Sequence, residues 1–189
     1  MKKHQPDSYH ISQKLFIRDK NKLLIFRLKQ GGILDLPGGR INTDEFNVPL
    51  KQSLLREARE EVGADLKFAV NLKPVVLFRH QVPDGRRDAG SRIFLIGYEA
   101  EYLRGLVKLS NEHSEYFWQD LAKIKKLKDQ FFPGVWEGVR QYLNFRLQKV
   151  KTSNKRNLFI KIVICASLDF TPQIQKTAQA LRKLGHQLE

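Results

Sequence analysis

The sequence predicts an α+β fold in which helices pack against a β-sheet. Apolar runs rich in β-branched and aromatic residues alternate with segments whose apolar residues recur at helical spacing. Of the 189 residues, 41% are hydrophobic and 10% are aromatic, which is enough to build one core. This composition excludes a disordered chain.

The N-terminal third contains three predicted strands. Residues 10–18 and 22–28 flank the polar turn Asp19-Lys20-Asn21 and are apolar enough for interior strands. Gly31-Gly32 then interrupts the apolar run before a short strand at residues 33–36.

A helix is predicted from about Pro49 to Val62. Proline suits the first turn of a helix, where its missing N–H costs nothing, and Gly63 is a natural residue to end it. Leu54 and Ala58 lie on one side of this helix together with Val62, and we expect that side to pack on the sheet.

The central part predicts more sheet and a loop. Residues 66–78 form one or two strands around Pro74, and residues 91–102 form another. The composition of residues 79–90 is typical of a loop. Its Arg86 and Arg87 either bind phosphates or are solvated, and we favour phosphate contact.

The C-terminal part predicts two helices, at residues 119–127 and 135–150, the second covering the sheet. Residues 1–150 are expected to form one domain, followed by a basic linker at 151–157. Residues 158–189 then form a β-α extension or a truncated second domain, with a strand at 157–166 and a helix at 171–184. This strand–turn–helix resembles the start of nucleoside deoxyribosyltransferase-like domains.

The net charge of 34 − 20 = +14 favours acidic partners, such as nucleotides, nucleic acid or anionic surfaces. A solvated basic surface is the alternative. Cys165 is the only cysteine, which excludes an internal disulfide and a Cys/His zinc site, and we expect a buried, inert thiol. We expect a cytoplasmic protein, because neither a signal peptide nor a membrane-spanning run is present.

Three glutamates mark the predicted site. Glu57, Glu60 and Glu61 are spaced three and four residues apart, so a helix brings them together as one acidic cluster. Such a cluster suits a hard, oxygen-seeking cation such as Mg²⁺. The alternative is a solvated helix whose carboxylates pair with Arg56 and Arg59, each pair contributing about 0.2–0.5 kcal/mol.

These residues resemble the signature of Nudix hydrolases. Gly39 is followed after five residues by Glu45, and residues 56–63 spell Arg-Glu-Ala-Arg-Glu-Glu-Val-Gly. The spacer between Glu45 and Arg56 has ten residues instead of seven, so the position of Glu45 depends on the path of the loop. Residues 34–39 and 111–118 also resemble the family, and the resemblance spans residues 10–145.

The resemblance implies an α/β/α sandwich with a mixed sheet and a Mg²⁺ site that Mn²⁺ can also occupy. Glu57 and Glu61 would be direct ligands, Glu60 a ligand or a partner through water, and the Gly38 carbonyl a further ligand. Arg56 would orient a glutamate. Glu112 would be the distal base or ligand, with Glu115 as the alternative.

The remaining candidates are residues that would bind substrate and residues with a structural role. Glu45, Arg86 and Arg87 are candidates for substrate binding. His113 is expected to be a bystander unless it orients substrate. Trp118 is expected to lie in the core, and Tyr98 and Phe94 are expected to pack within the sheet strands.

The implied activity is Mg²⁺-dependent hydrolysis of the diphosphate linkage in nucleoside di- or triphosphate derivatives by activated water. The cues for ADP-ribose and dinucleoside polyphosphate subfamilies are missing after the signature, where His80 stands, so a mutator-type, pool-sanitising enzyme is favoured. The alternatives are an RNA-processing or nucleic-acid-binding protein on the same scaffold and a nucleotide sensor. The oligomeric state is open, and a homodimer is compatible with the sequence.

Overall fold

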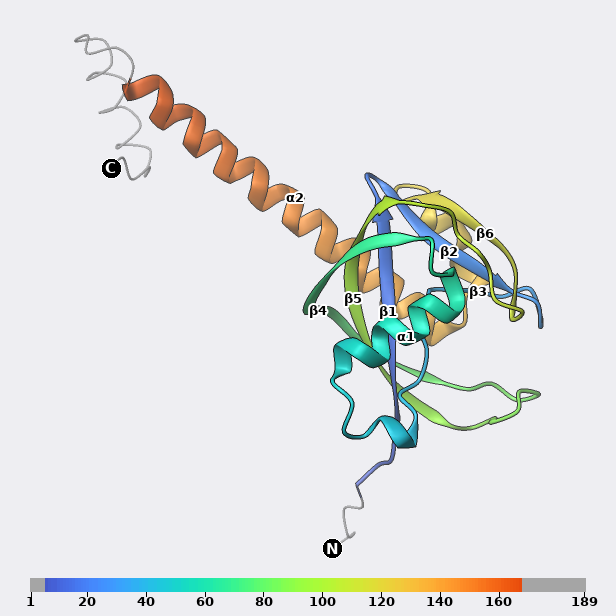
Figure 1. Cartoon of the computed structure of the whole chain (residues 1–189). Helices are drawn as coiled ribbons and strands as arrows, with labels where there is room; N and C mark the ends of the chain where they lie inside the picture. The colour runs from blue at the N-terminus through green and yellow to red at the C-terminus, as the bar shows by residue number, and fades with distance from the viewer. Residues whose placement is uncertain (1–5, 168–189) are drawn as a thin grey trace, which may run out of the picture. The chain divides into compact units, whose positions relative to one another are not determined.

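A mixed β-sheet forms the centre of the molecule (Figure 1). The structure, a computed structural model, describes the backbone of residues 6–167 and the side chains of residues 6–149 and Thr152. The strand order is β3-β2-β1-β5-β4, and β6 also pairs with β2. The strands are β1 His10–Asp19, β2 Lys22–Leu28, β3 Leu34–Asp35, β4 Lys67–Gln81, β5 Arg92–Arg104 and β6 His113–Asp120.

The first strand has two different neighbours along its length. It runs parallel to β5 from His10↔Ile93 to Arg18↔Glu101, whereas it pairs with β2 only beside the hairpin, at Arg18 and Asp19. The N-terminal half of β1 therefore has main-chain groups that β2 does not use. The segment after β3 takes them: Leu15 N donates to Pro37 O (2.7 Å), and Gln13 N donates to Gly39 O (2.9 Å).

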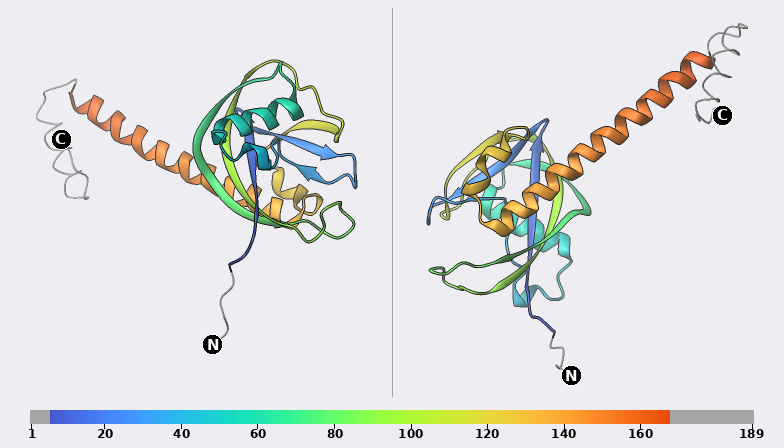
Figure 2. Two further views of the ribbon diagram at one scale, coloured as in Figure 1. Left: turned by 60° about the horizontal axis from the view of Figure 1, so that its bottom comes forward. Right: turned by 180° about the vertical axis from the view of Figure 1, so that it is seen from behind.

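Helices cover both faces of the sheet (Figure 2). On one face, α1 (Leu50–Val62) buries Leu54, Ala58 and Val62 against Leu15 and Ile17 of β1. On the other face, Phe16 stacks on Tyr142 of α2 with ring centroids 4.3 Å apart. Alternation along β1 therefore supplies both layers of the core.

Both ends of α1 form as the sequence predicts. Pro49 precedes the first helical residue, and Gly63 ends the helix with φ +82° and an N–H that donates to Arg59 O (3.0 Å). The strands predicted at residues 10–18, 22–28, 66–78 and 91–102 are also present, with small differences at their ends.

The helix predicted at residues 119–127 is wrong in its first part. Strand β6 continues to Asp120 because Tyr116, Phe117 and Trp118 pair with β2, and a 3₁₀ helix, η2 (Ile124–Gln130), follows. Aromatic residues favour a strand when a neighbouring strand is available. β4 likewise extends to Gln81, which shortens the predicted loop.

The C-terminal prediction also needs correction. Helix α2 (Pro133–Ser167) includes the predicted linker, 151–157, and the predicted strand, 157–166. No glycine or proline occurs between Val139 and Ser167 to end a helix, and a short apolar run does not by itself distinguish a strand from a helix.

The chain divides into two compact units between Leu143 and Asn144, which is earlier than the predicted boundary. The helix predicted at 171–184 lies outside the described residues. Among the helices of residues 6–167, none is long and apolar enough to cross a membrane.

Candidate active site

A cavity of about 660 Å³ gathers most of the predicted site residues. Five carboxylates line it: Asp35, Glu57, Glu61, Asp88 and Glu112. The Gly38-Gly39 bend lines it as well, together with four basic residues: Lys14, Arg40, Arg86 and Arg87. A cavity of this size is typical of a site for a small ligand.

The glycine bend is held in place by β1. Gly38 has φ +120°, and a Cβ there would lie 2.2 Å from Gln13 O, so the position requires glycine. Ser12 Oγ also donates to Gly39 O at 2.9 Å. The bend is therefore a fixed wall of the cavity.

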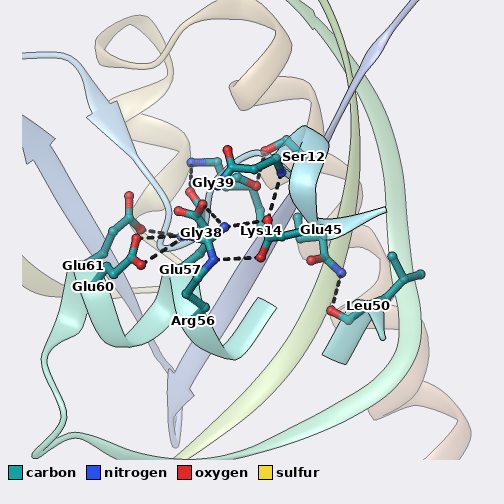
Figure 3. Close-up of polar contacts among 12 residues, drawn as sticks. Ser12, Lys14, Gly38, Gly39, Glu45, Leu50, Arg56, Glu57, Glu60 and Glu61 are labelled. Atoms are coloured by element: carbon teal, nitrogen blue, oxygen red, sulfur yellow. Dashed lines mark hydrogen bonds and ion pairs between the residues drawn. The ribbon is translucent and has the colours of Figure 1, made fainter. Parts of the chain in front are cut away.

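Two carboxylates of α1 lie directly against this bend (Figure 3). The Gly38 N–H donates to Glu61 Oε2 at 2.5 Å. A Cβ on Gly39 would lie only 2.0 Å from Glu57 Oε2. Both glycines thus make room for, or bind, a carboxylate.

Arg56 binds three glutamates at once (Figure 3). Its Nε and Nη2 donate to the two oxygens of Glu45 at 2.7 and 2.8 Å, and Nη2 also donates to Glu57 Oε1 at 2.7 Å. Nη1 donates to Glu60 Oε2 at 3.0 Å. These charge-assisted bonds fix the Glu57 carboxylate beside the bend.

Glu45 reaches back to the helix despite the longer spacer, but it reaches Arg56 and not the cavity. It is buried, and its Oε2 also accepts the Asn42 N–H at 2.8 Å. The Arg56 hydrogen bonds, helped by Asn42, lower the pKa of Glu45 to about 2. Glu45 is therefore not part of the cavity lining, and its contact with substrate stays a prediction.

Glu60 separates from the other two glutamates of the helix. Its side chain is 58% exposed, compared with 16% for Glu57 and 14% for Glu61, and it does not line the cavity. The predicted cluster of three is therefore a pair at the bend, with Glu60 outside on Arg56.

Burial disfavours the charged forms of Glu57 and Glu61, the two carboxylates at the bend. Burial raises the pKa of Glu61 to about 8, although Lys14 and the Gly38 N–H act in the opposite direction. Burial also raises the pKa of Glu57, against the effect of Arg56. A cation placed between these carboxylates would favour their charged forms.

The two candidates for the distal carboxylate, Glu112 and Glu115, lie in different surroundings. Glu112 lines the cavity, whereas Glu115 is half-exposed and pairs with Arg27. His113 is buried, with Nδ1 3.0 Å from Ser110 Oγ and Nε2 4.0 Å from Glu61 Oε1. Burial lowers the pKa of His113, which favours the neutral ring.

Tyr98 and Trp118 pack in or against the core, whereas Phe94 is half-buried on its strand. Tyr98 is buried in the core, and Trp118 packs edge-on against Tyr102 at a centroid distance of 5.2 Å. Phe94 packs edge-on against Tyr9.

Lys14 and Asp35 line the cavity but were not predicted. Lys14 Nζ donates to Asp35 Oδ2, Leu36 O and Gly38 O, each at 2.9 Å. Burial opposes its charge, but Asp35, Glu61 and Glu57 together raise the pKa of Lys14. The polar alternation Ser12–Lys14 within an apolar strand was the available signal, because such residues share one face.

Part of the cavity lining is basic and aromatic. Arg86 donates to the side-chain and main-chain oxygens of Gln30, both at 2.8 Å, and its guanidinium carbon lies 5.3 Å from the centre of the Phe132 ring. Arg87 is exposed at the edge, and Arg40 pairs with Asp88. The two arginines predicted to bind substrate thus line the same cavity as the carboxylates.

The donor set fits a hard divalent cation. It consists of carboxylate oxygens and a carbonyl, which Mg²⁺ prefers, and Gly39 leaves the space that a side chain would fill beside Glu57. Within the part of the chain that the structure describes, no three His, Cys, Asp or Glu side chains converge closely enough to form a metal site by themselves. Main-chain or substrate oxygens would have to complete the coordination.

Comparisons with known proteins identify the family and the fold. Residues 9–141 match the model of the NUDIX domain, whereas none of the curated proteins matches the chain. The fold is similar to that of a MutT protein from Methanosarcina mazei Go1, with 26% identity, a TM-score of 0.60, and coverage of 77% of this chain and 99% of that chain.

Two more distant structures share the fold. A NUDIX hydrolase from Nitrosomonas europaea has 16% identity and a TM-score of 0.56, with 71% of this chain and 88% of that chain covered. An Ap4A hydrolase from C. elegans has 17% identity and a TM-score of 0.53, with 74% and 98% covered. The expected sandwich around a mixed sheet is confirmed.

Proposed function

Because this chain belongs to the Nudix family of hydrolases, we propose that it cleaves the diphosphate linkage of nucleoside di- or triphosphate derivatives with the help of Mg²⁺. One observation carries the proposal. Glu57 and Glu61 lie against the Gly38-Gly39 bend in a cavity that Arg86 and Arg87 also line.

Glu57, Glu61 and Glu112 are the side chains that would hold the cation. Mg²⁺, or Mn²⁺ in its place, supplies charge neutralisation for the phosphates and lowers the pKa of a bound water. The Gly38 carbonyl, which the resemblance also implies as a ligand, already accepts a hydrogen bond from Lys14. Glu60 is better placed to support Arg56 than to bind metal.

The protein's own residues position and activate the reactants. Glu45 fixes Arg56, and Arg56 fixes Glu57, so the carboxylate does not need to reorganise during the reaction. Glu112 lines the same cavity and is our candidate to accept a proton from the attacking water. The water oxygen bonds to one phosphorus as the bridging P–O bond breaks, and the arginines compensate the charge of the phosphate that leaves.

Arg86 and Arg87 suit different parts of a phosphate chain. Arg86 is already oriented by Gln30, so it loses little conformational entropy when it binds an anion. Arg87 is exposed and can follow a longer substrate. A nucleoside with two or three phosphates matches a cavity lined by both carboxylates and arginines.

A panel of nucleoside di- and triphosphates and their derivatives, incubated with Mg²⁺, tests the proposal. We expect a nucleoside monophosphate product together with phosphate or pyrophosphate. The activity should disappear with a chelator and return with Mg²⁺ or Mn²⁺.

A different outcome would favour another function on the same scaffold. A nucleic-acid-binding protein would release no phosphate from any substrate, and would bind labelled RNA with an affinity that falls steeply with salt. A nucleotide sensor would bind a nucleotide without turnover. Either result would contradict the proposed hydrolase.

A further inference from the structure

Lys14 is a cation enclosed by oxygen atoms at the floor of the cavity. Its ammonium lies 2.9 Å from each of three oxygens: the Asp35 carboxylate and the carbonyls of Leu36 and Gly38. An ammonium group has three N–H donors, so all of them are used. The side chain is only 9% exposed.

The same oxygens resemble the coordination shell of a hard metal ion. Carboxylate and main-chain carbonyl oxygens are the ligands that Mg²⁺, Mn²⁺ and Ca²⁺ take from proteins. The Glu61 carboxylate is also near enough to be influenced by the Lys14 charge. The position between these oxygens, which a metal ion could occupy, is therefore filled by the Lys14 ammonium.

We infer that the Lys14 ammonium takes the place of a divalent cation on the Asp35 carboxylate and the Gly38 carbonyl. Lys14 is then a positioning residue, and the exchangeable metal of the proposed hydrolase, on which this inference builds, depends on Glu57, Glu61 and Glu112.

The arrangement has a direct benefit for the site. Lys14 connects β1 to the bend by donating to the Gly38 carbonyl, and the Gly38 N–H donates to Glu61. A permanent cation keeps this connection in the absence of metal, when carboxylates alone would repel one another. The bend therefore remains ready for substrate whether or not metal is bound.

Counting bound Mn²⁺ tests the inference. The full chain is stripped of metal and titrated with Mn²⁺, and the free ion is measured by electron paramagnetic resonance. We expect Lys14→Met to bind one more Mn²⁺ per chain than the wild type, because methionine keeps much of the aliphatic volume but leaves the oxygens without a cation. Mn²⁺ should also raise the Tm of Lys14→Met more than that of the wild type.

Two further variants make the result specific. Lys14→Met combined with Asp35→Asn should lose the additional ion, because the cage then has no carboxylate. Arg40→Ala is the matched control: it removes another cavity cation, one that pairs with Asp88 outside this cage, and should leave the count unchanged.

Equal Mn²⁺ counts in Lys14→Met and the wild type would overturn the inference, as would an additional ion that persists in the double variant. If Lys14→Met does not fold, Lys14→Gln, whose amide can still donate to a carbonyl of the cage, is titrated in its place: it should bind one more Mn²⁺ than the wild type, and an equal count would overturn the inference. The proposed hydrolase is tested separately, by turnover and Mn²⁺ binding of the wild type.

Discussion

Arg56 shows how neighbouring residues hold a carboxylate of the candidate site in place. The guanidinium binds Glu45, Glu57 and Glu60, but only Glu57 lines the cavity. Glu45 is thus a buried counter-charge behind Glu57. Pairing of this kind is costly to break, because it leaves a partly buried arginine without its main partner.

Glu45 should make the protein sensitive to acid. Its pKa of about 2 in the folded protein lies below the ordinary value of 4.5, so its contribution to stability is present above pH 4.5 and is lost as the pH falls toward 2. We expect Glu45→Gln to be less stable near neutral pH and to have a flatter decline of Tm between these two pH values.

The control for that measurement is Glu137→Gln. Arg140 also lowers the pKa of Glu137 to about 2, but both side chains are about half-exposed, and solvent screens such pairs. Its Tm profile should remain close to that of the wild type. If the decline of Tm at acid pH were the same in Glu45→Gln as in the wild type, the buried Glu45–Arg56 pair would not contribute to stability.

The two distal glutamates give a second test at this scale. Glu112→Gln should lower kcat by about 10²–10⁴-fold if the carboxylate accepts a proton, because this is the usual contribution of a general base. Glu115→Gln should change kcat little, because Glu115 pairs with Arg27 away from the cavity. Steady-state kinetics on both variants distinguishes them, and the reverse order would assign the role to Glu115.

The residues of the site were only partly predictable. Glu57 and Glu61 follow from helical spacing, because both are on one face of an amphipathic helix. Lys14 and Asp35 do not, because each lies within an apolar strand and they meet only when the bend folds onto β1. The exposed position of Glu60 could not be predicted either, because the spacing does not show which glutamate pairs with Arg56 outside the cavity.

At the scale of elements, the site depends on where β1 and β2 separate. The two strands pair only beside their hairpin, and the bend after β3 occupies the gap along β1. Helix α1 then brings its carboxylates to the same place. The bend and the helix are therefore positioned by one strand.

Replacing the two glycines of the bend by alanine should have different effects, one on stability and the other on turnover. Gly38→Ala combines a left-handed backbone with a contact of 2.2 Å to Gln13 O, so we expect a loss of about 2–5 kcal/mol in the free energy of unfolding. Gly39→Ala meets only the flexible end of Glu57, so the fold should remain and turnover should fall. Chemical denaturation and kinetics measure the two effects.

Gly85→Ala is the control for backbone conformation. Gly85 also has a positive φ, of +80°, but its Cβ would meet no atom within 4 Å. We expect a loss of only about 1–2 kcal/mol, the cost of a left-handed backbone. Equal losses for Gly38→Ala and Gly85→Ala would contradict the role of the close contact with β1.

Strand and helix order up to β5 could be predicted because the apolar patterns there have clear periods and are separated by glycine or proline. β6 could not, because its pairing with β2 is a long-range contact that the local sequence does not show. The extent of α2 could not either, since the apolar run at residues 158–164 is compatible with both a strand and a helix.

At the scale of the whole molecule, the charge of +14 should attract anionic substrates. Surface charges are screened beyond about 10 Å at 0.1 M salt. We therefore expect kcat/KM for a nucleotide to fall with increasing ionic strength while kcat changes little. Kinetics over a salt series at saturating Mg²⁺ provides the measurement.

The arginine at the edge of the cavity should account for part of this dependence. Arg87→Ala should show a weaker response to salt than the wild type, whereas Lys22→Ala, which removes an exposed charge outside the cavity lining, should not. If kcat/KM of the wild type does not change with salt, the overall charge has no part in substrate capture.

The central claim is that Glu61 at the glycine bend, and not Glu60 on the same helix, is needed for metal-dependent hydrolysis. The most direct measurement is Mg²⁺-dependent phosphate or pyrophosphate release by the wild type, Glu61→Gln and Glu60→Gln, each shown to be folded. We predict a loss of at least about 10²-fold in kcat for Glu61→Gln, in the range for removal of an essential charged group, and a much smaller effect for Glu60→Gln. Turnover by Glu61→Gln at the wild-type rate would contradict the account.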